Sequence, residues 1–107
     1  MGAWTVTFEE RVADDLQWFA KKERRLVFES LMSMLEDDPT VETKNVKTLR
    51  ANRFAQRELR IRGKYRVLFN VDTGQKRVLV LAIGEKQGER LVVRGEEFTA
   101  HHEDDPT

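Results

Sequence analysis

The stretch from Glu58 to Phe69, Glu-Leu-Arg-Ile-Arg-Gly-Lys-Tyr-Arg-Val-Leu-Phe, alternates charged and apolar residues on both sides of Gly63-Lys64. A period of two is typical of strands that bury one face, and a glycine between two such runs favours a tight turn. The sequence therefore predicts two antiparallel strands, residues 56–62 and 65–71, joined at Gly63-Lys64.

The same alternation predicts which side chains share a face. If Leu59 and Ile61 point into a core, their charged neighbours point to the opposite face of the sheet. Arg60, Arg62 and Arg66 are then expected to converge on that face. The result would be a concentrated positive field, which is the usual electrostatic footprint of a phosphate-bearing partner.

Further strands follow these two. A turn at residues 72–75 leads to a third strand at 76–83, and residues 78–83 are apolar at every position, which favours a central strand covered on both faces. Residues 84–88 contain two glycines and are interpreted as a turn that ends this strand, and residues 90–94 as a short final strand.

The N-terminal part alternates as a strand from Trp4 to Phe8 and then changes to helical spacing. We predict a first helix at residues 9–20 and a second that ends at Asp37-Asp38-Pro39, because proline stops a helix. Strand, helical hairpin and antiparallel meander together predict a single α+β domain over residues 1–107, with the helices on one face of the sheet and a basic open face. The last residues, from about 99, read as an acidic flexible tail.

Residues 40–55 show neither period and are interpreted as a surface connection, with room for a short helical turn. Nine basic residues and a single acid, Glu58, lie between Lys44 and Arg66, although the formal charge of the whole chain is zero. Five of the nine, all before Glu58, are expected to bind nucleic acid: Lys44, Lys47, Arg50, Arg53 and Arg57.

Composition excludes several classes of protein. The chain has 107 residues and no cysteine, so disulfides, thiolate catalysis and cysteine-type zinc sites are excluded. Its longest apolar stretch is far shorter than the roughly 20 residues of a membrane helix. The N-terminus lacks a secretory pattern, so we expect a cytoplasmic protein. His101 and His102 lie beside acidic residues, but adjacent histidines point opposite ways in an extended segment, so no metal site and no cofactor are expected.

From Trp4 to Val93 the order of elements, the segment 58–69 and the ending Ile83-Gly-Glu-Lys86 together resemble the RelE/ParE superfamily of toxins from type II toxin-antitoxin systems. The resemblance implies a toxin that a cognate antitoxin neutralises. RelE-like members cut messenger RNA on the ribosome, whereas ParE-like members poison DNA gyrase, and the shared fold does not separate the two activities.

The resemblance also implies roles for particular residues. Arg66 matches the arginine that contacts the scissile phosphate, Arg60 and Arg62 correspond loosely to a basic pair on the preceding strand, and Lys86 falls where the family often has another cation. Many nuclease members carry a tyrosine or histidine near the C-terminus that transfers a proton. In this sequence residues 89–98 contain neither, and only His101 and His102 follow.

Cleavage of RNA by its own 2′-hydroxyl needs a base, cationic donors for the phosphate and an acid for the leaving oxygen. Arginine suits only the second task. Lys64 or Lys86 becomes a base if neighbouring positive charge lowers its pKa, and Glu58 is another candidate base, although a salt bridge is the favoured interpretation for it.

Two functions therefore remain open. The leading one is a metal-independent, RelE-like endoribonuclease that inhibits translation, with an antitoxin and ribosome-bound message as partners and oligomers formed only through the antitoxin. The alternative is a ParE-like gyrase inhibitor or a toxin homologue that acts by binding only, which the missing C-terminal tyrosine or histidine favours.

Overall fold

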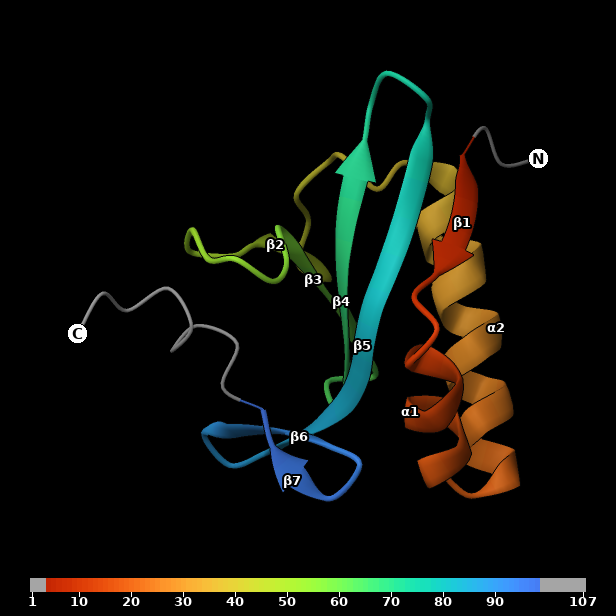
Figure 1. Ribbon diagram of the computed structural model, residues 1–107, viewed down its shortest axis with the longest axis vertical. Helices are drawn as coiled ribbons and strands as arrows, with labels where there is room; N and C mark the ends of the chain where they lie inside the picture. Colours follow the sequence, from red (N-terminus) through yellow and green to blue (C-terminus); the bar gives the residue numbers. More distant parts are fainter. Residues whose placement is uncertain (1–3, 99–107) are drawn as a thin grey trace.

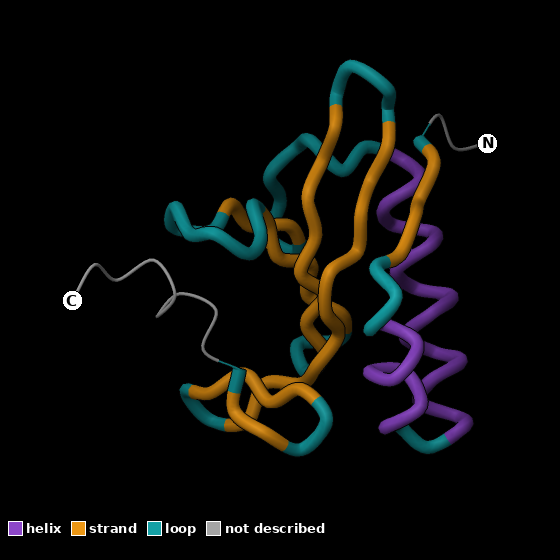
Figure 2. Tube along the Cα trace, viewed as in Figure 1, coloured by secondary structure: helices purple, strands orange, loops and turns teal. Residues whose placement is uncertain are grey.

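The computed structural model describes residues 4–98, and the predicted acidic tail lies outside them. Two helices pack on one side of a seven-stranded sheet, as Figures 1 and 2 show. The predicted α+β class, with a helical hairpin on one face, is therefore confirmed. In chain order the elements are β1 (Thr5–Phe8), α1 (Val12–Trp18), α2 (Lys21–Asp37), β2 (Val46–Thr48), β3 (Arg57–Ile61), β4 (Tyr65–Asp72), β5 (Arg77–Gln87), β6 (Arg90–Val93) and β7 (Glu96–Glu97).

The predicted meander forms the centre of the sheet. The strands run in the order β2-β3-β4-β5-β6-β7, with antiparallel neighbours, and β1 adds in parallel to β5. Since β4 occupies one edge of β5, both β1 and β6 lie on the other edge, where they pair with residues 77–80 and 85–87. Between these two segments, none of the strands in residues 4–98 lies beside β5 on that edge.

The core lies between the sheet and α2. Leu59 and Ile61 are buried together with Val67 and Phe69, as the alternation predicted, and they pack with the apolar stripe of α2 around Leu31. Fully burying one such side chain contributes about 1.5–3 kcal/mol. The apolar stretch 78–83 is the covered central strand that the sequence predicted.

Both predicted helices are present with different bounds. The first is confined to Val12–Trp18, because Phe19 and Ala20 take extended ψ angles of 151° and 152°. The second already begins at Lys21, so the charged run after Ala20 is helical. The apolar spacing alone could not reveal this break, since Phe19 stays buried beyond it.

Two loop predictions were wrong. The connection 40–55 contains strand β2 and no helical turn, because Val46 is buried opposite Leu59 and the two backbones pair. Residues 84–87 extend β5 instead of ending it. Gly84 serves close packing: a Cβ there would lie 2.8 Å from Val93 Cγ2 and would overlap the carbonyl oxygen of Val92 in β6. None of the helices in residues 4–98 is long and apolar enough to cross a membrane.

Candidate nucleic-acid interface

The face of the sheet that points away from the helices carries two adjacent rows of paired residues. The first row holds Lys47, Glu58, Leu68 and Ala82, and the second holds Arg60, Arg66 and Gly84. Both rows follow from the alternation of side chains along a strand, which places every second residue on this face. This is the face that was predicted to be open. It carries a charged row beside a row in which Leu68 and Ala82 are buried in a second apolar cluster with Phe54 and Phe98.

Arg66 is the buried centre of the charged row. Only 7% of the residue is exposed, and its Nη1 donates to the backbone oxygens of Gly63, at 3.1 Å, and Tyr65, at 3.2 Å. Burial lowers the pKa of Arg66, and the carboxylate of Glu58 opposes this shift. Arginine starts so far above neutrality that the guanidinium keeps its charge. The turn thus holds a fixed positive group on the open face.

Glu58 joins the two arginines. Its Oε1 lies 3.1 Å from Nε of Arg60 and 3.7 Å from Nε of Arg66, and its side chain is only 16% exposed. The favoured interpretation of Glu58 as a salt-bridge partner is confirmed by these distances. A carboxylate between two guanidinium groups occupies a position in which a bound phosphate would also be stabilised.

Arg62 does not join this cluster. It follows the last residue of β3 and has a φ of 53°, in the left-handed region, so strand alternation does not apply to it. Its side chain is exposed. The predicted convergence of three arginines was therefore wrong for Arg62 and right for Arg60 and Arg66, which pair directly across β3 and β4.

Lys64 is surrounded by acids that the local sequence does not contain. Its Nζ lies 3.3 Å from Glu23 of α2 and 3.8 Å from Glu85 of β5, and Tyr65 donates its hydroxyl to the same Glu23 carboxylate at 2.7 Å. The hydrogen bond to Glu23, more than any other contact, raises the pKa of Lys64. The prediction of a lowered pKa for Lys64 was wrong, since acids from distant elements reverse the expected field.

Lys86 lies in β5 opposite Leu91 of β6, on the same open face. Its backbone N–H donates to the carbonyl oxygen of Lys64 at 2.8 Å, which ties β5 to the turn between β3 and β4. The Lys86 side chain is exposed. Lys86 lies two residues along β5 from Gly84, which pairs with Arg66.

The basic residues of the connection are dispersed. Lys47 lies in the first row of the open face, opposite Glu58, and Arg50 lines a pocket described below, whereas Lys44 is exposed in the loop before β2. Arg53 is exposed in the loop before β3. Arg57 pairs with Phe69 and so lies on the face of the helices, where its Nη1 is 3.4 Å from the hydroxyl of Thr48.

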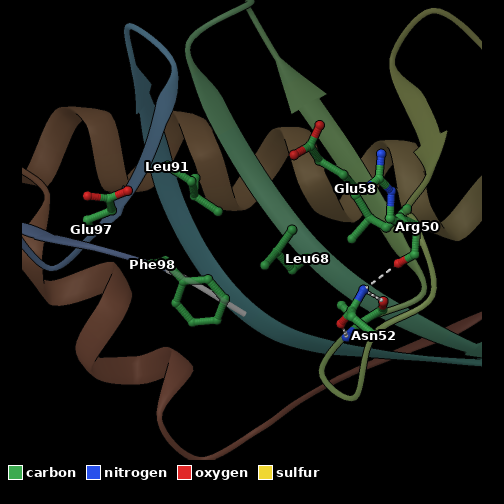
Figure 3. Close-up of a pocket in the computed structure, with 9 residues that line it drawn as sticks. Arg50, Asn52, Glu58, Leu68, Leu91, Glu97 and Phe98 are labelled. Carbon is green, nitrogen blue, oxygen red and sulfur yellow. Dashed lines mark hydrogen bonds between the residues drawn. The ribbon is translucent and has the colours of Figure 1, made fainter. Parts of the chain in front are cut away.

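A pocket of about 300 Å³ opens beside the charged cluster. Figure 3 shows Leu68 and Leu91 at its centre, with Phe98 and Glu97 on one side and Glu58, Arg50 and Asn52 on the other. Leu49 and Ala55 complete the lining. The sequence does not reveal this pocket, because residues 90–98 reach it only through the hairpin of β6 and β7. The hairpin folds back so that the N–H of Phe98 donates to the oxygen of Leu91 at 2.7 Å.

Comparison with known proteins shows which family the chain belongs to. A family model described as "Phage derived protein Gp49-like (DUF891)" matches residues 14–94. The chain belongs to this Gp49-like family. Among curated protein sequences, none is significantly similar to it.

Solved structures resemble this Gp49-like chain over most of its length. The toxin-antitoxin complex RelBE2 from Mycobacterium tuberculosis contains a chain with 26% identity and a TM-score of 0.68, covering 80% of this chain and 94% of that one. The archaeal RelE-RelB complex from Pyrococcus horikoshii gives 25% identity and a TM-score of 0.62, with coverage of 80% and 97%. The isolated toxin RelE from Escherichia coli, at 22% identity and a TM-score of 0.61 over 81% and 89%, shows the shared fold alone. The sequence-based resemblance to RelE-type toxins is therefore confirmed.

Within residues 4–98 of the Gp49-like chain, few groups at the open face can transfer a proton. Its single tyrosine, Tyr65, points to the helices and donates to Glu23, and burial raises its pKa. His101 and His102 lie outside the described residues. Within residues 4–98 no group of three or more histidine, aspartate or glutamate side chains is placed to hold a metal ion. Glu58 is thus the titratable group that contacts both arginines of the charged row.

Proposed function

We propose that this protein is the toxin of a type II toxin-antitoxin pair and that it cleaves messenger RNA on the ribosome, in the cytoplasm. The observation that carries the proposal is the cluster of Arg66, Glu58 and Arg60 on the open sheet face, next to a pocket. Membership of the Gp49-like family and the likeness to the toxin chains of RelE-RelB complexes support it.

The chemistry follows from the positions of the charged groups. Arg60 and Arg66 hold the non-bridging oxygens of the scissile phosphate, and the planar fork of a guanidinium suits two oxygens of one phosphate. Arg66 acts as a preorganised donor because its own turn fixes it, so little reorganisation is needed when charge develops on phosphorus.

Glu58 accepts the proton. The 2′-hydroxyl of the preceding ribose gives its proton to a carboxylate oxygen of Glu58, and the O2′ atom forms a bond to phosphorus while the bond from phosphorus to O5′ breaks. The ammonium of Lys86, on the same face two residues along β5 from Gly84, returns a proton to O5′. The products are a 2′,3′-cyclic phosphate and a 5′-hydroxyl, so atoms and charge balance without a metal ion.

The antitoxin is the second partner. An acidic or amphipathic segment complements the charged row and the pocket, and it would neutralise the toxin by covering the Arg60 and Arg66 pair. The known structures in which similar chains form toxin-antitoxin complexes support a partner of this kind.

The decisive test is brief induction of the chain in bacteria without its antitoxin, with growth and message integrity measured together. Wild type should arrest growth and cut messages, and Arg66→Ala should reduce cleavage by roughly a hundredfold or more. Arg25→Ala, which removes an exposed guanidinium of α2, is the matched control and should behave as wild type. Full toxicity of Arg66→Ala would overturn the assignment.

The same induction separates the roles within the cluster. Glu58→Gln keeps the shape of the side chain but cannot take a proton, so cleavage should fall while RNA binding persists. Lys86→Ala should slow cleavage less than Arg66→Ala. Gyrase-linked DNA breaks with intact messages would instead establish a ParE-like inhibitor.

A further inference from the structure

The proposed cleavage of the phosphate bond does not use the pocket beside the charged row. Leu68, Leu91 and Phe98 give it apolar walls, and its polar lining comes from Arg50, Asn52, Glu58 and Glu97. We propose that it binds the base of the nucleotide whose phosphate lies on Arg60 and Arg66, and that it prefers guanine. The proposal rests on the proposed function, since it assigns the base that this site selects.

The strand register separates the pocket from the phosphate site by about the length of one nucleotide. Glu58 and Leu68 pair directly, and the next pair on the same face is Arg60 with Arg66. Two residues along a strand correspond to about 6.5–7 Å. This is the span from a nucleobase through its ribose to the phosphate, so one nucleotide can occupy both places.

The size and lining of the pocket fit an aromatic ring. Its volume of about 300 Å³ exceeds that of a two-ring base, and ligand pockets are typically apolar with few polar groups. Phe98 offers a stacking surface. Neighbouring side chains hold it in place, because its ring centroid lies 4.8 Å from the ring centroid of Phe54 and 5.6 Å from the guanidinium carbon of Arg11.

The polar groups of the pocket select among bases. Asn52 is fully engaged within its own loop, where Nδ2 donates to the oxygens of Arg50 and Ala55 and Oδ1 accepts from two backbone N–H groups. Glu58 belongs to the arginine pair. Arg50 and Glu97 remain. The guanidinium of Arg50 only donates, and both guanine and uracil offer it a carbonyl oxygen, so it does not separate them. Glu97 lies 3.9 Å from Arg90 in an exposed ion pair that contributes little.

A carboxylate only accepts hydrogen bonds, so Glu97 favours a base that presents adjacent donors. Guanine presents its N1–H and its N2 amino group side by side, and a carboxylate can accept both. Uracil presents a single N–H between two carbonyl oxygens, which a carboxylate repels. The lining therefore favours guanine over uracil.

Calorimetric titration of the purified full-length chain with 3′-GMP, 3′-UMP and inorganic phosphate tests this inference. We expect 3′-GMP to bind at least about tenfold more tightly than 3′-UMP, and phosphate alone to bind more weakly than either. Glu97→Gln should reduce the preference for guanine, because it weakens 3′-GMP binding and no longer repels the carbonyl oxygens of 3′-UMP, whose affinity should not fall. Equal affinities for the two nucleotides and for phosphate would overturn the proposal.

Phe98 provides a second, independent variant. Phe98→Ala should weaken both nucleotides at least about fivefold without changing phosphate affinity, and Phe98→Tyr, which keeps the ring, should restore nucleotide binding. Phe28→Ala, at an exposed aromatic of α2, is the control and should bind as wild type. If Phe98→Ala is poorly folded by thermal denaturation, the Glu97→Gln result decides. Growth arrest without nucleotide preference would refute the pocket assignment alone, whereas guanine preference without message cleavage would refute the proposed function alone.

Discussion

The carboxylate of Asp15 accepts a hydrogen bond from the backbone N–H of Ile83, at 3.0 Å, where none of the described strands lies beside the edge of β5. Asp15 is fully buried in α1, and its other oxygen lies 3.1 Å from Nε of Arg94, the residue after β6. Burial raises the pKa of Asp15, while the Ile83 N–H and the nearby arginines oppose the shift. One helical side chain therefore replaces a missing strand and anchors the hairpin that carries the pocket wall.

Asp15→Ala should destabilise the fold by about 2–4 kcal/mol, because it leaves the Ile83 N–H buried without an acceptor and Arg94 without its carboxylate. Urea denaturation followed by circular dichroism measures this change. Asp14→Ala, at the exposed neighbouring position, should stay within about 0.5 kcal/mol of wild type. Equal stabilities of the two variants would show that the Asp15 contacts do not anchor the sheet.

Gly84→Ala should destabilise the protein by about 1–3 kcal/mol, because the added methyl group would overlap β6 at Val92 and Val93. Thermal denaturation is the measurement. Gly74→Ala is the matched control: its Cβ would lie 3.5 Å from Asp72 Oδ1, an ordinary contact, and no strain arises from its backbone. We expect the control to be neutral or slightly stabilising. A Gly84→Ala protein as stable as the control would mean that β6 can move away without cost.

The sequence predicted the sheet more completely than the site. Local alternation is sufficient to separate Leu59 and Ile61 from Arg60, because the period of a strand assigns each side chain to a face. It fails at Arg62, where the backbone leaves the strand. Strand bounds near Gly84 were also missed, because only the approach of β6 explains a glycine inside a strand.

Charge balance could not be predicted from neighbouring residues. The run from Lys44 to Arg66 contains one acid, but the fold brings Glu23 and Glu85 to Lys64 from elements distant in sequence. Phe98 reaches the pocket for the same kind of reason, since its position depends on the hairpin of β6 and β7. Such contacts join distant parts of the chain, so the residues next to each partner in the sequence do not reveal them.

The contact between Glu23 and Tyr65 predicts a pH dependence of stability. The tyrosine hydrogen bond and then that of Lys64 lower the pKa of Glu23 below its usual 4.5. A carboxyl with a lowered folded pKa stabilises the protein above the unfolded pKa and loses that contribution as the pH falls through the folded value. The stability difference between wild type and Glu23→Gln should thus be constant above pH 4.5 and shrink below it.

Urea midpoints from pH 7 to pH 3 measure this difference. Tyr65→Phe removes the principal hydrogen bond and should reduce the same acid-dependent part, while Lys64 still contacts Glu23. Parallel pH profiles for wild type and Glu23→Gln would contradict the assignment. The effect should be modest, since the Glu23 side chain is more than a third exposed and water screens its ion pair.

The position of Lys47 on the open face predicts how the affinity for RNA depends on salt. It lies on the open face opposite Glu58, one row from the arginine pair, so it should contact a neighbouring phosphate of a single strand. Each neutralised phosphate of single-stranded nucleic acid contributes about 0.7 to the slope of log affinity against log salt. Lys47→Ala should therefore make that slope shallower by about 0.7, as fluorescence anisotropy with a labelled oligoribonucleotide would show. Lys22→Ala, at an exposed position of α2 on the other side of the sheet, should leave the slope unchanged. If both variants shift the slope equally, RNA does not follow the open face, and the charged row is not its binding surface.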